Sequence, residues 1–426
     1  MNFRAFLFSG FLMLSTWSLS AQQSKVLPNE VPDIEDPDST ILIPMEFDNT
    51  LDNLLHTWLI ERSDSSDCSS EEVMLNVSDS IYKLRLSKMP CLMEMPFNNS
   101  VRSFIELYTV RKRRQVEYMM GMSDYYFPIF EQILGANNLP LELKYLPIIE
   151  SALNTTIVSH MGAAGLWQFM IGTGRMYGLE INSLVDERLD PVKATYAAAR
   201  FLKDLYSIYG DWNLVIAAYN CGPGNVNKAI RRAGGKRDYW AIYPYLPRET
   251  RGYVPIFIAA NYAMHYATHH NLCKAKVQMP VITDTVMVNE RVHLQQISDV
   301  LNIPIQQVRL MNPQYRKDIV PGNIKPYSVC LPLNYANSFI ENYANVVSYK
   351  ADSLIHNRRS EIEIQPLNTS VSPGGGSGRV IYHKVKKGQT LGYIANKHGV
   401  SLAKLKRWNN IRGSKINIGQ RIKIIK

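Results

Sequence analysis

The sequence predicts a multidomain α+β protein, in which a large all-α domain is followed by small modules with the order strand–helix–helix–strand (βααβ). Two observations carry this prediction. From residue 99 to residue 275 the apolar residues recur at helical spacing, without strand-like alternation of any length. After Cys273 the pattern changes to short alternating runs that contain an internal repeat. A chain of 426 residues also exceeds what one core usually serves, so several modules are expected.

The first residues are predicted to be an export signal. Arg4 supplies a positive charge, residues 5–17 are apolar, and residues 18–21 form an exit rich in small residues. This stretch is shorter than the roughly 20 apolar residues of a membrane span, although an uncleaved anchor stays an alternative. Because the first cysteine is Cys68, no lipoprotein attachment site is expected. We therefore expect an exported protein of the periplasm or cell envelope.

A glutamate inside an apolar run is the candidate catalytic acid. Glu150 lies in the segment LPIIESAL, between aliphatic neighbours on both sides. Loss of solvation disfavours a charged carboxylate, so we expect a raised pKa for Glu150 and a proton donor near neutral pH. A helix-surface glutamate with apolar neighbours is the alternative.

Two later segments have the composition of cleft walls. In SHMGAAGLWQFM, small residues surround Trp167 and Gln168, and the amide of Gln168 offers both a donor and an acceptor. An ordinary core position is the alternative for Trp167. In WNLVIAAYNCGPGNV, Tyr219 and Asn220 stand at the end of an apolar helix that a glycine–proline turn breaks.

These segments, with LPRETRGYV further on, resemble the four motifs of the lytic transglycosylase domain of glycoside hydrolase family 23, which is related to goose-type lysozyme. The segments LPRET and DERLDP are most similar to the membrane-bound lytic murein transglycosylase D group. The resemblance covers roughly residues 102–270 and implies a lysozyme-like catalytic domain. It departs from the usual pattern at Ile171 and Cys221, away from the chemistry.

The resemblance also implies roles for the residues that match the motifs. Glu150 would be the catalytic acid, Ser151 would orient or polarise it, and Tyr253 would hydrogen-bond near it. Contacts to the N-acetyl and ring groups of the substrate would come from Gln168, Tyr219 and Asn220. An ordinary helix-packing role is the alternative for Ser151 and Tyr253.

The implied reaction is cleavage of the β-1,4 bond between N-acetylmuramic acid and N-acetylglucosamine in peptidoglycan. Glu150 would protonate the leaving oxygen and then deprotonate the C6 hydroxyl, which closes a 1,6-anhydro ring. A hydrolase needs a second carboxylate at about 5–5.5 Å or about 6.5–9.5 Å, and the sequence offers none that convinces. Glu142 would lie roughly 12 Å away along a continuous helix. The remaining acids are interpreted as helix caps or surface charges: Asp186, Glu187, Asp190 and Asp211.

Two other functions stay open at this point. A goose-type muramidase of the same fold would use water, and the mass of the product would reveal it. A non-catalytic wall-binding protein would lack the acid, whereas Glu150 is present.

Residues 281–334 and 380–426 are two copies of one repeat. Seven positions of the first copy recur 97 residues later as apolar or identical residues. They are Val288, Leu294, Ile297, Ile303, Ile305, Val308 and Asn312, which match Val385, Leu391, Ile394, Val400, Leu402, Leu405 and Asn409. The second copy resembles a LysM module, which implies binding of N-acetylglucosamine runs. The first is a degenerate LysM-like domain, with a packing role as the alternative to sugar binding.

Changes in composition along the chain predict the domain boundaries. The predicted parts are a signal peptide at 1–21, an N-terminal arm or linker with some helix at 22–98, the catalytic domain at 99–275, the LysM-like domain at 281–334, a linker at 335–379 and the LysM module at 380–426. Within the catalytic domain, helices are expected at 99–122, from Asp190 to about Tyr209, from Asp211 to Asn220, and at 250–269.

Peptidoglycan glycan strands are the expected partner of the catalytic domain and of the LysM module. The module carries twelve Lys or Arg and no Asp or Glu, so it should be attracted to polyanions. The export signal favours the anionic cell wall, and no nucleic acid partner is expected. Neither a metal nor a cofactor motif is present in the sequence. Peripheral membrane association and the oligomeric state stay open.

Three smaller interpretations concern charged and sulfur-bearing residues. The basic run Arg111–Arg114 is interpreted as a solvated helix face. His269 and His270 are interpreted as a helix end that interacts with the helix dipole. Export permits disulfides, and Cys68 with Cys91 is one conceivable pair.

Overall fold

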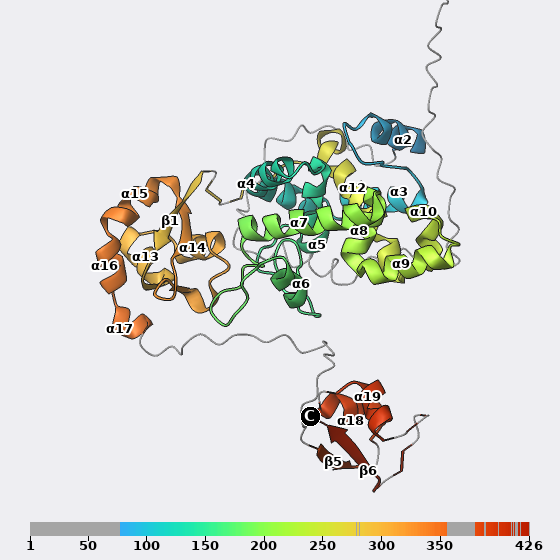
Figure 1. The fold of residues 1–426 in the computed structure, drawn as a ribbon. Helices are drawn as coiled ribbons and strands as arrows, with labels where there is room; N and C mark the ends of the chain where they lie inside the picture. The colour runs from blue at the N-terminus through green and yellow to red at the C-terminus, as the bar shows by residue number, and fades with distance from the viewer. Residues whose placement is uncertain are drawn as a thin grey trace, which may run out of the picture. The chain divides into compact units, whose positions relative to one another are not determined.

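The computed structural model describes residues 77–355 without 278 and 281, and residues 380–425 without 387, 388, 399, 410, 412, 414, 415 and 418. The described residues belong to two compact units, one before and one after the boundary at Ile364 (Figure 1). The first unit contains a helical lobe and a small α+β domain. The predicted signal peptide, most of the N-terminal arm and residues 356–379 of the predicted linker lie outside the described residues.

The helical lobe is built from helices and loops, and its described residues, 77–277, form isolated β-bridges but no strand. Its main helices are α2 (Asp79–Lys88), α3 (Asn99–Glu106), α4 (Arg113–Ala136), α5 (Leu146–Ser151), α6 (Ile171–Met176), α7 (Pro191–Tyr209), α8 (Trp212–Cys221), α9 (Pro223–Arg232), α10 (Tyr239–Ile242), α11 (Arg248–Arg251) and α12 (Tyr253–His265). A π-helical turn at Leu107–Arg111 and 3₁₀ helices at Leu141–Tyr145, Tyr243–Tyr245 and Thr268–His270 join them.

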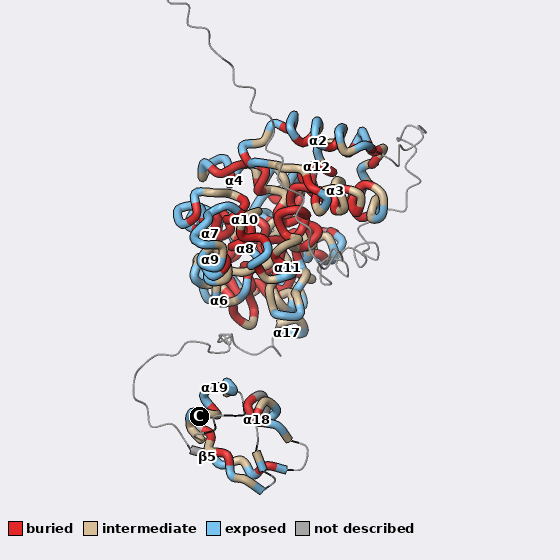
Figure 2. Tube along the Cα trace, turned by 90° about the vertical axis from the view of Figure 1, so that its right-hand side faces the viewer, coloured by how far each residue is buried: buried red, intermediate tan, exposed pale blue. Residues whose placement is uncertain are grey.

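Helix α12 forms the centre of the lobe. Eleven of its residues are buried, so it is apolar on all sides, as expected for a helix enclosed by others. It contacts α3, α5 and α8, and Figure 2 shows this interior as the buried part of the lobe. The site is therefore built on helices that the main core holds in place.

The predicted helices are found, with two breaks. Asp190 and Asp211 cap α7 and α8 with their side chains, as predicted. The helix expected at 99–122 is interrupted by the π-helical turn Leu107–Arg111 and by Lys112, whose backbone leaves the helical region. The helix expected at 250–269 is divided between α11 and α12 at Gly252.

The core of the helical lobe begins before the boundary predicted at residue 98. Residues 77–98 belong to the core of the helical lobe, where Tyr82 and Leu86 of α2 are buried. Arg85 donates a hydrogen bond to the hydroxyl of Tyr262 in α12 at 2.8 Å. Tyr82, Leu84 and Leu86 of α2 alternate with charged residues, so the sequence shows no clear apolar helix face although the helix packs against the core.

The basic run and the histidines agree with their interpretations only in part. Arg111 and Arg114 are exposed, as interpreted. Arg113 does not extend into solvent, because it donates to the carbonyls of Thr109 and His270 at 2.7 and 2.9 Å. His270 is buried, and burial together with the charges of Arg85 and Arg113 lowers its pKa to about 4. A neutral imidazole gains little from a helix dipole, so the interpretation is wrong for His270, whereas His269 is exposed in the 3₁₀ turn Thr268–His270.

The cysteine pair considered for Cys68 and Cys91 is also wrong. Cys91 is a free thiol, as are Cys221 and Cys330, whereas Cys273 is disulfide-bonded. Within the described part of the chain, no helix combines the length and the apolar character that crossing a membrane requires.

The small domain of the first unit has the expected βααβ order with additions. Strand β1 (Thr283–Val288) pairs antiparallel with β4 (Tyr327–Pro332), and β2 (Arg291–His293) pairs with β3 (Ile319–Pro321). Helices α13 (Leu294–Leu301) and α14 (Ile305–Met311) connect the two halves, and the 3₁₀ turn Arg316–Asp318 precedes β3.

The linker predicted at 335–379 begins later than expected. Helices α15 (Leu333–Glu341), α16 (Tyr343–Ser348) and α17 (Ala351–Leu354) follow β4 directly. Ala336, Phe339 and Val346 are buried in the core of the LysM-like domain, so α15 and α16 complete that domain. These helices are short and rich in Asn, Ser and Tyr, which is why their sequence resembles a linker.

The second unit is a separate βααβ module. Strand β5 (Val380–Lys384) pairs antiparallel with β6 (Arg421–Ile425), and α18 (Leu391–His398) and α19 (Leu402–Trp408) lie between them in sequence. Asn409 donates to the carbonyls of Leu405 and Lys423, both at 2.8 Å. Its counterpart Asn312 makes the same pair of contacts in the first module. The predicted fold class, an all-α lobe followed by βααβ modules, is confirmed.

Candidate active site

Glu150 lies at the end of a short helix that opens into a cleft. Helix α5 starts with Pro147 in its first turn and stops at Ala152, whose backbone is left-handed (φ 49°). The cleft has a volume of about 940 Å³. It is lined by five of the six residues predicted from the motifs: Glu150, Gln168, Tyr219, Asn220 and Tyr253. The sixth, Ser151, is buried next to Glu150.

Two tyrosines lie near the carboxylate of Glu150. The hydroxyl of Tyr253 donates a hydrogen bond to Oε1 of Glu150. The hydroxyl of Tyr219 donates to the carbonyl of Trp167 at 2.6 Å. Burial, and then the negative charge of Glu150, raises the pKa of both phenols well above its usual value. Both tyrosines therefore stay protonated near neutral pH and act as hydrogen-bond donors.

Ser151 contacts backbone rather than the acid itself. Its hydroxyl lies 2.9 Å from the carbonyl of Pro147 and 3.0 Å from that of Leu166. The second contact joins α5 to the segment that carries Trp167. Trp167 is fully buried and donates its indole N–H to Thr195 at 2.9 Å, so the core alternative holds for this side chain.

Gln168 and Asn220 have polar atoms left for a ligand. Gln168 has a left-handed backbone (φ 46°), which is uncommon for a residue other than glycine. Its Nε2 donates to the carbonyl of Gly165 at 2.8 Å, and its amide oxygen accepts no hydrogen bond from the described residues. The Oδ1 of Asn220 accepts from the hydroxyl of Thr250 at 2.9 Å, which leaves its NH₂ as a donor at the cleft.

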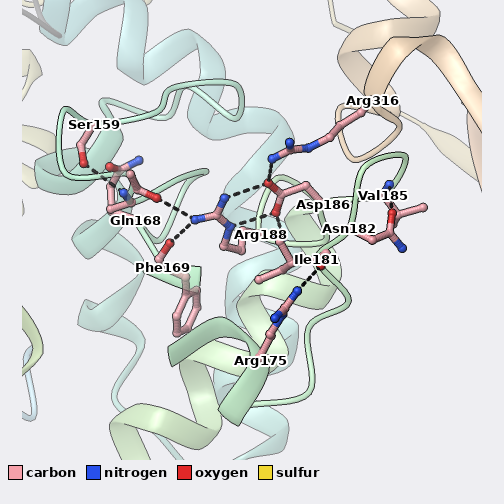
Figure 3. Close-up of polar contacts among 12 residues, drawn as sticks. Ser159, Gln168, Phe169, Arg175, Ile181, Asn182, Val185, Asp186, Arg188 and Arg316 are labelled. Atoms are coloured by element: carbon pink, nitrogen blue, oxygen red, sulfur yellow. Dashed lines mark hydrogen bonds and ion pairs between the residues drawn. The ribbon is translucent and has the colours of Figure 1, made fainter. Parts of the chain in front are cut away.

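The loop that carries Gln168 is held by an arginine (Figure 3). Nη1 of Arg188 donates to the carbonyls of Gly162 and Phe169 at 2.8 and 2.9 Å. The same guanidinium binds both oxygens of Asp186, at 2.9 Å through Nε and at 2.8 Å through Nη2. Gly165 approaches the backbone of Arg188 so closely that a Cβ there would lie 1.9 Å from its carbonyl oxygen.

The interpretation of Asp186 and Glu187 as cap or surface charges is wrong. Asp186 is 1% exposed and pairs with Arg188, which is 3% exposed. Burial alone would raise the pKa of Asp186, but the hydrogen bonds and charges of Arg188 and Arg316 outweigh it and lower the pKa. Glu187 is also buried and accepts a hydrogen bond from Lys193 at 2.6 Å. No local pattern in the sequence indicates these partners, since one of them lies 130 residues away.

The other acids considered from the sequence have structural partners. Glu142 is buried and accepts a hydrogen bond from the backbone of Leu92. Asp190 and Asp211 accept from the first backbone N–H groups of α7 and α8. Each of these carboxylates is therefore occupied within the fold.

Sequence reasoning missed Asp204, the second carboxylate that lines the cleft among the described residues. It lies on α7 and accepts a hydrogen bond from the hydroxyl of Tyr177 at 2.9 Å. Phe201, Leu205 and Ile208 of the same helix also line the cleft. Their spacing of three to four residues marks one face of α7 and was the signal that could have revealed Asp204.

The rim of the cleft carries exposed apolar side chains that the sequence analysis also missed. Met161 and Met176 are 72% and 78% exposed, and Val158 is 59% exposed. All three line the cleft. Methionine adapts its shape to different partners, so this rim offers an apolar contact for a bound molecule.

Three segments of the chain match known families. Residues 127–242 match the family described as Transglycosylase SLT domain. Residues 282–348 match Lytic transglycosylase MltD, LysM-like domain, and residues 383–424 match LysM domain. The three matches follow one another in the order of the helical lobe, the small domain of the first unit and the second unit.

Individual proteins are similar over different lengths. Membrane-bound lytic murein transglycosylase D of Escherichia coli (strain K12) is 31% identical over 344 residues, which cover 78% of this chain and 70% of that protein. Soluble lytic murein transglycosylase of the same strain is 34% identical over 116 residues, which cover 26% of this chain and 18% of that protein. The solved structure of the 70 kDa soluble lytic transglycosylase from Escherichia coli has 28% identity, covers 36% of this chain and 26% of that chain, and has a TM-score of 0.30.

Proposed function

Because the chain belongs to the membrane-bound lytic murein transglycosylase D family, as its motifs predicted, we propose that Glu150 is the residue with which it cuts peptidoglycan. The protein is a lytic transglycosylase with a LysM-like domain and a cell-wall-binding LysM module. The observation that carries the assignment of the acid is the position of Glu150. It lines the cleft beside two buried phenols, and one of them donates a hydrogen bond to its carboxylate.

Glu150 performs two proton transfers in this proposal. As a carboxylic acid it protonates the oxygen of the β-1,4 bond, and the bond between that oxygen and C1 of the muramyl sugar breaks. As a carboxylate it then removes the proton of the C6 hydroxyl of the same sugar. The C6 oxygen bonds to C1, which closes the 1,6-anhydro ring and returns the proton to Glu150. No water is consumed, so one carboxyl group is enough.

Tyr253 keeps the carboxyl group oriented during both transfers. Its hydroxyl donates a hydrogen bond to Oε1 of Glu150. Ser151 supports the acid indirectly, since it joins α5 to the carbonyl of Leu166. Tyr219 joins α8 to the segment that carries Gln168, because its hydroxyl donates to the carbonyl of Trp167.

Gln168 and Asn220 bind an acetamido group of the sugar. The amide oxygen of Gln168 accepts the N–H of that group, and the NH₂ of Asn220 donates to its carbonyl. The hydrogen bonds that these two side chains already make leave these two atoms free among the described residues. Both sugars of peptidoglycan carry such a group, so this pair accepts either sugar and does not by itself select the bond that is cut.

The location of the protein follows from its substrate. The relative in Escherichia coli is named membrane-bound, and the murein on which it acts is part of the cell envelope. For this chain we propose export by residues 1–21 and action in the periplasm.

Product mass tests the proposed reaction. Peptidoglycan digested with the purified protein should yield glycans that end in 1,6-anhydro-N-acetylmuramic acid, each lighter by one water than a hydrolysis product. Reducing muramic acid ends as the main product would instead establish a muramidase. Asp204 is the observation that favours this second candidate, because it is a further carboxylate at the cleft that could direct water. Asp204→Asn should leave the anhydro product unchanged if the first proposal holds.

A further inference from the structure

The LysM-like domain is joined to the helical lobe through the loop that follows α6. Leu184 and Val185 of this loop are 2% and 0% exposed, and they belong to the core of the LysM-like domain. The backbone N–H of Asp186 donates to the carbonyl of Gln314 at 2.9 Å, and that of Arg316 donates to the carbonyl of Leu184 at 2.7 Å. The loop is therefore paired with the LysM-like domain by backbone and by core side chains.

A side-chain contact continues this connection toward the cleft. Nη2 of Arg316, in the LysM-like domain, donates to Oδ2 of Asp186 (Figure 3). The same Asp186 oxygen accepts from Nη2 of Arg188. Arg188 in turn holds the carbonyls of Gly162 and Phe169. Three consecutive charged groups thus connect the LysM-like domain with the loop that lines the cleft.

The cleft loop depends on this support because it has little regular structure of its own. Residues 157–170 contain turns and the isolated bridges of Ala164 with Val158 and Phe169, but no helix. Arg188 binds the loop at both ends of its inner turn, at Gly162 and at Phe169. A shift of Arg188 would move Gln168, which lies between these two contacts.

We propose that Arg316 is a positioning residue of the transglycosylase reaction and that the LysM-like domain acts as a brace for the cleft loop. Arg316 donates a second hydrogen bond to Oδ2 of Asp186 and so fixes the position of this carboxylate. Because Asp186 in turn fixes Arg188, the cleft loop keeps the orientation that substrate binding needs. The inference rests on the proposed function of the cleft. It assigns the degenerate module a role within the catalytic unit instead of separate sugar binding.

The two copies of the repeat differ in their contacts with the helical lobe, and this difference supports the brace. The segment after α14 that contains Gln314 and Arg316 is occupied by the helical lobe. Further contacts join the same surfaces, since Lys325 binds Glu180 at 2.6 Å and the hydroxyl of Tyr327 binds the same carboxylate at 2.6 Å. The module at 380–425 belongs to the other unit. One copy of the repeat is thus committed to the lobe.

The test compares two cations of this interface in the full-length protein. Arg316→Gln removes the contact that leads to Arg188, and Lys325→Gln removes an ion pair of the same interface that does not. Arg316→Gln should lower kcat/KM on short soluble peptidoglycan glycans about tenfold, in the range of one lost charge-assisted hydrogen bond, and a raised KM should account for most of it because the loop carries the sugar-binding Gln168. Lys325→Gln should change kcat/KM by less than about twofold. Arg316→Lys should restore most of the loss.

Hydrogen exchange gives a second readout that needs no substrate. The amides of Ala164 and Phe169 bond to each other's carbonyls at 3.1 and 3.2 Å, so their exchange reports the state of the cleft loop. Exchange there should be faster in Arg316→Gln than in wild type or Lys325→Gln. Equal kinetics and equal exchange in both variants would overturn the brace. If wild type forms no anhydro product, the proposed function fails, and the exchange measurement still decides whether Arg316 holds the loop.

Discussion

The hydroxyl of Tyr253 donates a hydrogen bond to the carboxylate of Glu150 across 103 residues of sequence. Tyr253 is the first residue of α12, the buried central helix, and Glu150 is the second-last residue of α5. The central helix therefore sets the orientation of the acid. Tyr253→Phe keeps the ring and removes the bond, so kcat should fall about 10- to 100-fold, as expected for a hydrogen bond to a charged group.

The split between kcat and KM distinguishes this role from ordinary packing. The ring of Tyr253 is 4% exposed, and phenylalanine preserves its shape, so the thermal midpoint should change by no more than a few degrees. KM should stay within about twofold, because Tyr253 orients the acid and not the sugar. A variant with wild-type kcat would mean that the bond has no catalytic role.

Replacement of the acid gives the largest expected loss. Glu150→Gln retains the size of the side chain but can neither donate nor accept the proton, and general acid–base catalysis contributes about 10²–10⁴-fold. Turnover of soluble glycans should fall by at least that range. Binding to insoluble peptidoglycan and the circular dichroism spectrum should stay as in wild type. Turnover within a few-fold of wild type would exclude Glu150 as the catalytic residue.

The acid and its surroundings differ in how far the sequence could predict them. Glu150, Gln168, Tyr219 and Asn220 lie inside local motifs, and each motif places its residues at a helix end or in a tight turn, so their meeting in one cleft was predictable. Asp204 belongs to no motif. Its position depends on how α7 packs against the cleft, which only the tertiary structure determines.

The contact of the LysM-like domain with the cleft loop could not be predicted from the sequence either, because it also depends on tertiary packing. Asp186 and Arg188 stand two residues apart in DERLDP and could have been solvated charges. Their burial results from Arg316 and from a backbone pairing with a domain more than a hundred residues later. The repeat itself was predictable, because the apolar positions that fill both βααβ cores recur at one offset. The use of one copy as a packing partner was not.

His270 gives the lobe a defined pH dependence. Its Nε2 accepts hydrogen bonds from Tyr262 at 3.0 Å and from Arg85 at 3.3 Å, so the neutral imidazole fits this buried site. The pKa of His270 is about 4 in the folded protein, against 6.5 for an ordinary solvated histidine, which represents the unfolded chain. The unfolded state therefore binds more protons between these values, and stability falls as the pH is lowered from about 6.5 to about 4. The loss is at most roughly 3 kcal/mol, which is the full value of a shift of this size.

Unfolding measured at several pH values checks this effect. His270→Asn should reduce the difference in unfolding free energy between pH 7 and pH 4.5, because the titrating group is gone. His269→Asn is the matched control, since His269 is the neighbouring residue and is exposed. An equal pH dependence in wild type and in His270→Asn would contradict the assignment of the effect to His270.

The second unit should bind the wall without taking part in cleavage. It has its own core, which includes Val385, Leu391, Ile394, Leu405 and Ile422. It also belongs to a different compact unit from the helical lobe. Removal of residues 380–426 should therefore leave kcat on short soluble glycans nearly unchanged. Retention on insoluble peptidoglycan should fall strongly, because the tethered module raises the local concentration of the catalytic unit at its polymer.

The salt dependence of retention distinguishes charge attraction from sugar contacts in the binding of the second unit to peptidoglycan. The module carries twelve cations and no acidic residue, and Lys404 and Arg407 of α19 are among its exposed charges. Attraction between exposed charges weakens as the Debye length falls from about 10 Å at 0.1 M salt to about 3 Å at 1 M, so retention of the full chain should decrease over this range. The sugar contacts should supply the part that high salt does not remove. Lys404→Glu with Arg407→Glu should lower retention at 0.1 M salt and leave it unchanged at 1 M. Equal retention of the full chain and the truncated chain at both salt concentrations would mean that the module binds a different ligand. Loss of cleavage of soluble glycans on truncation would mean that the module is part of the catalytic fold.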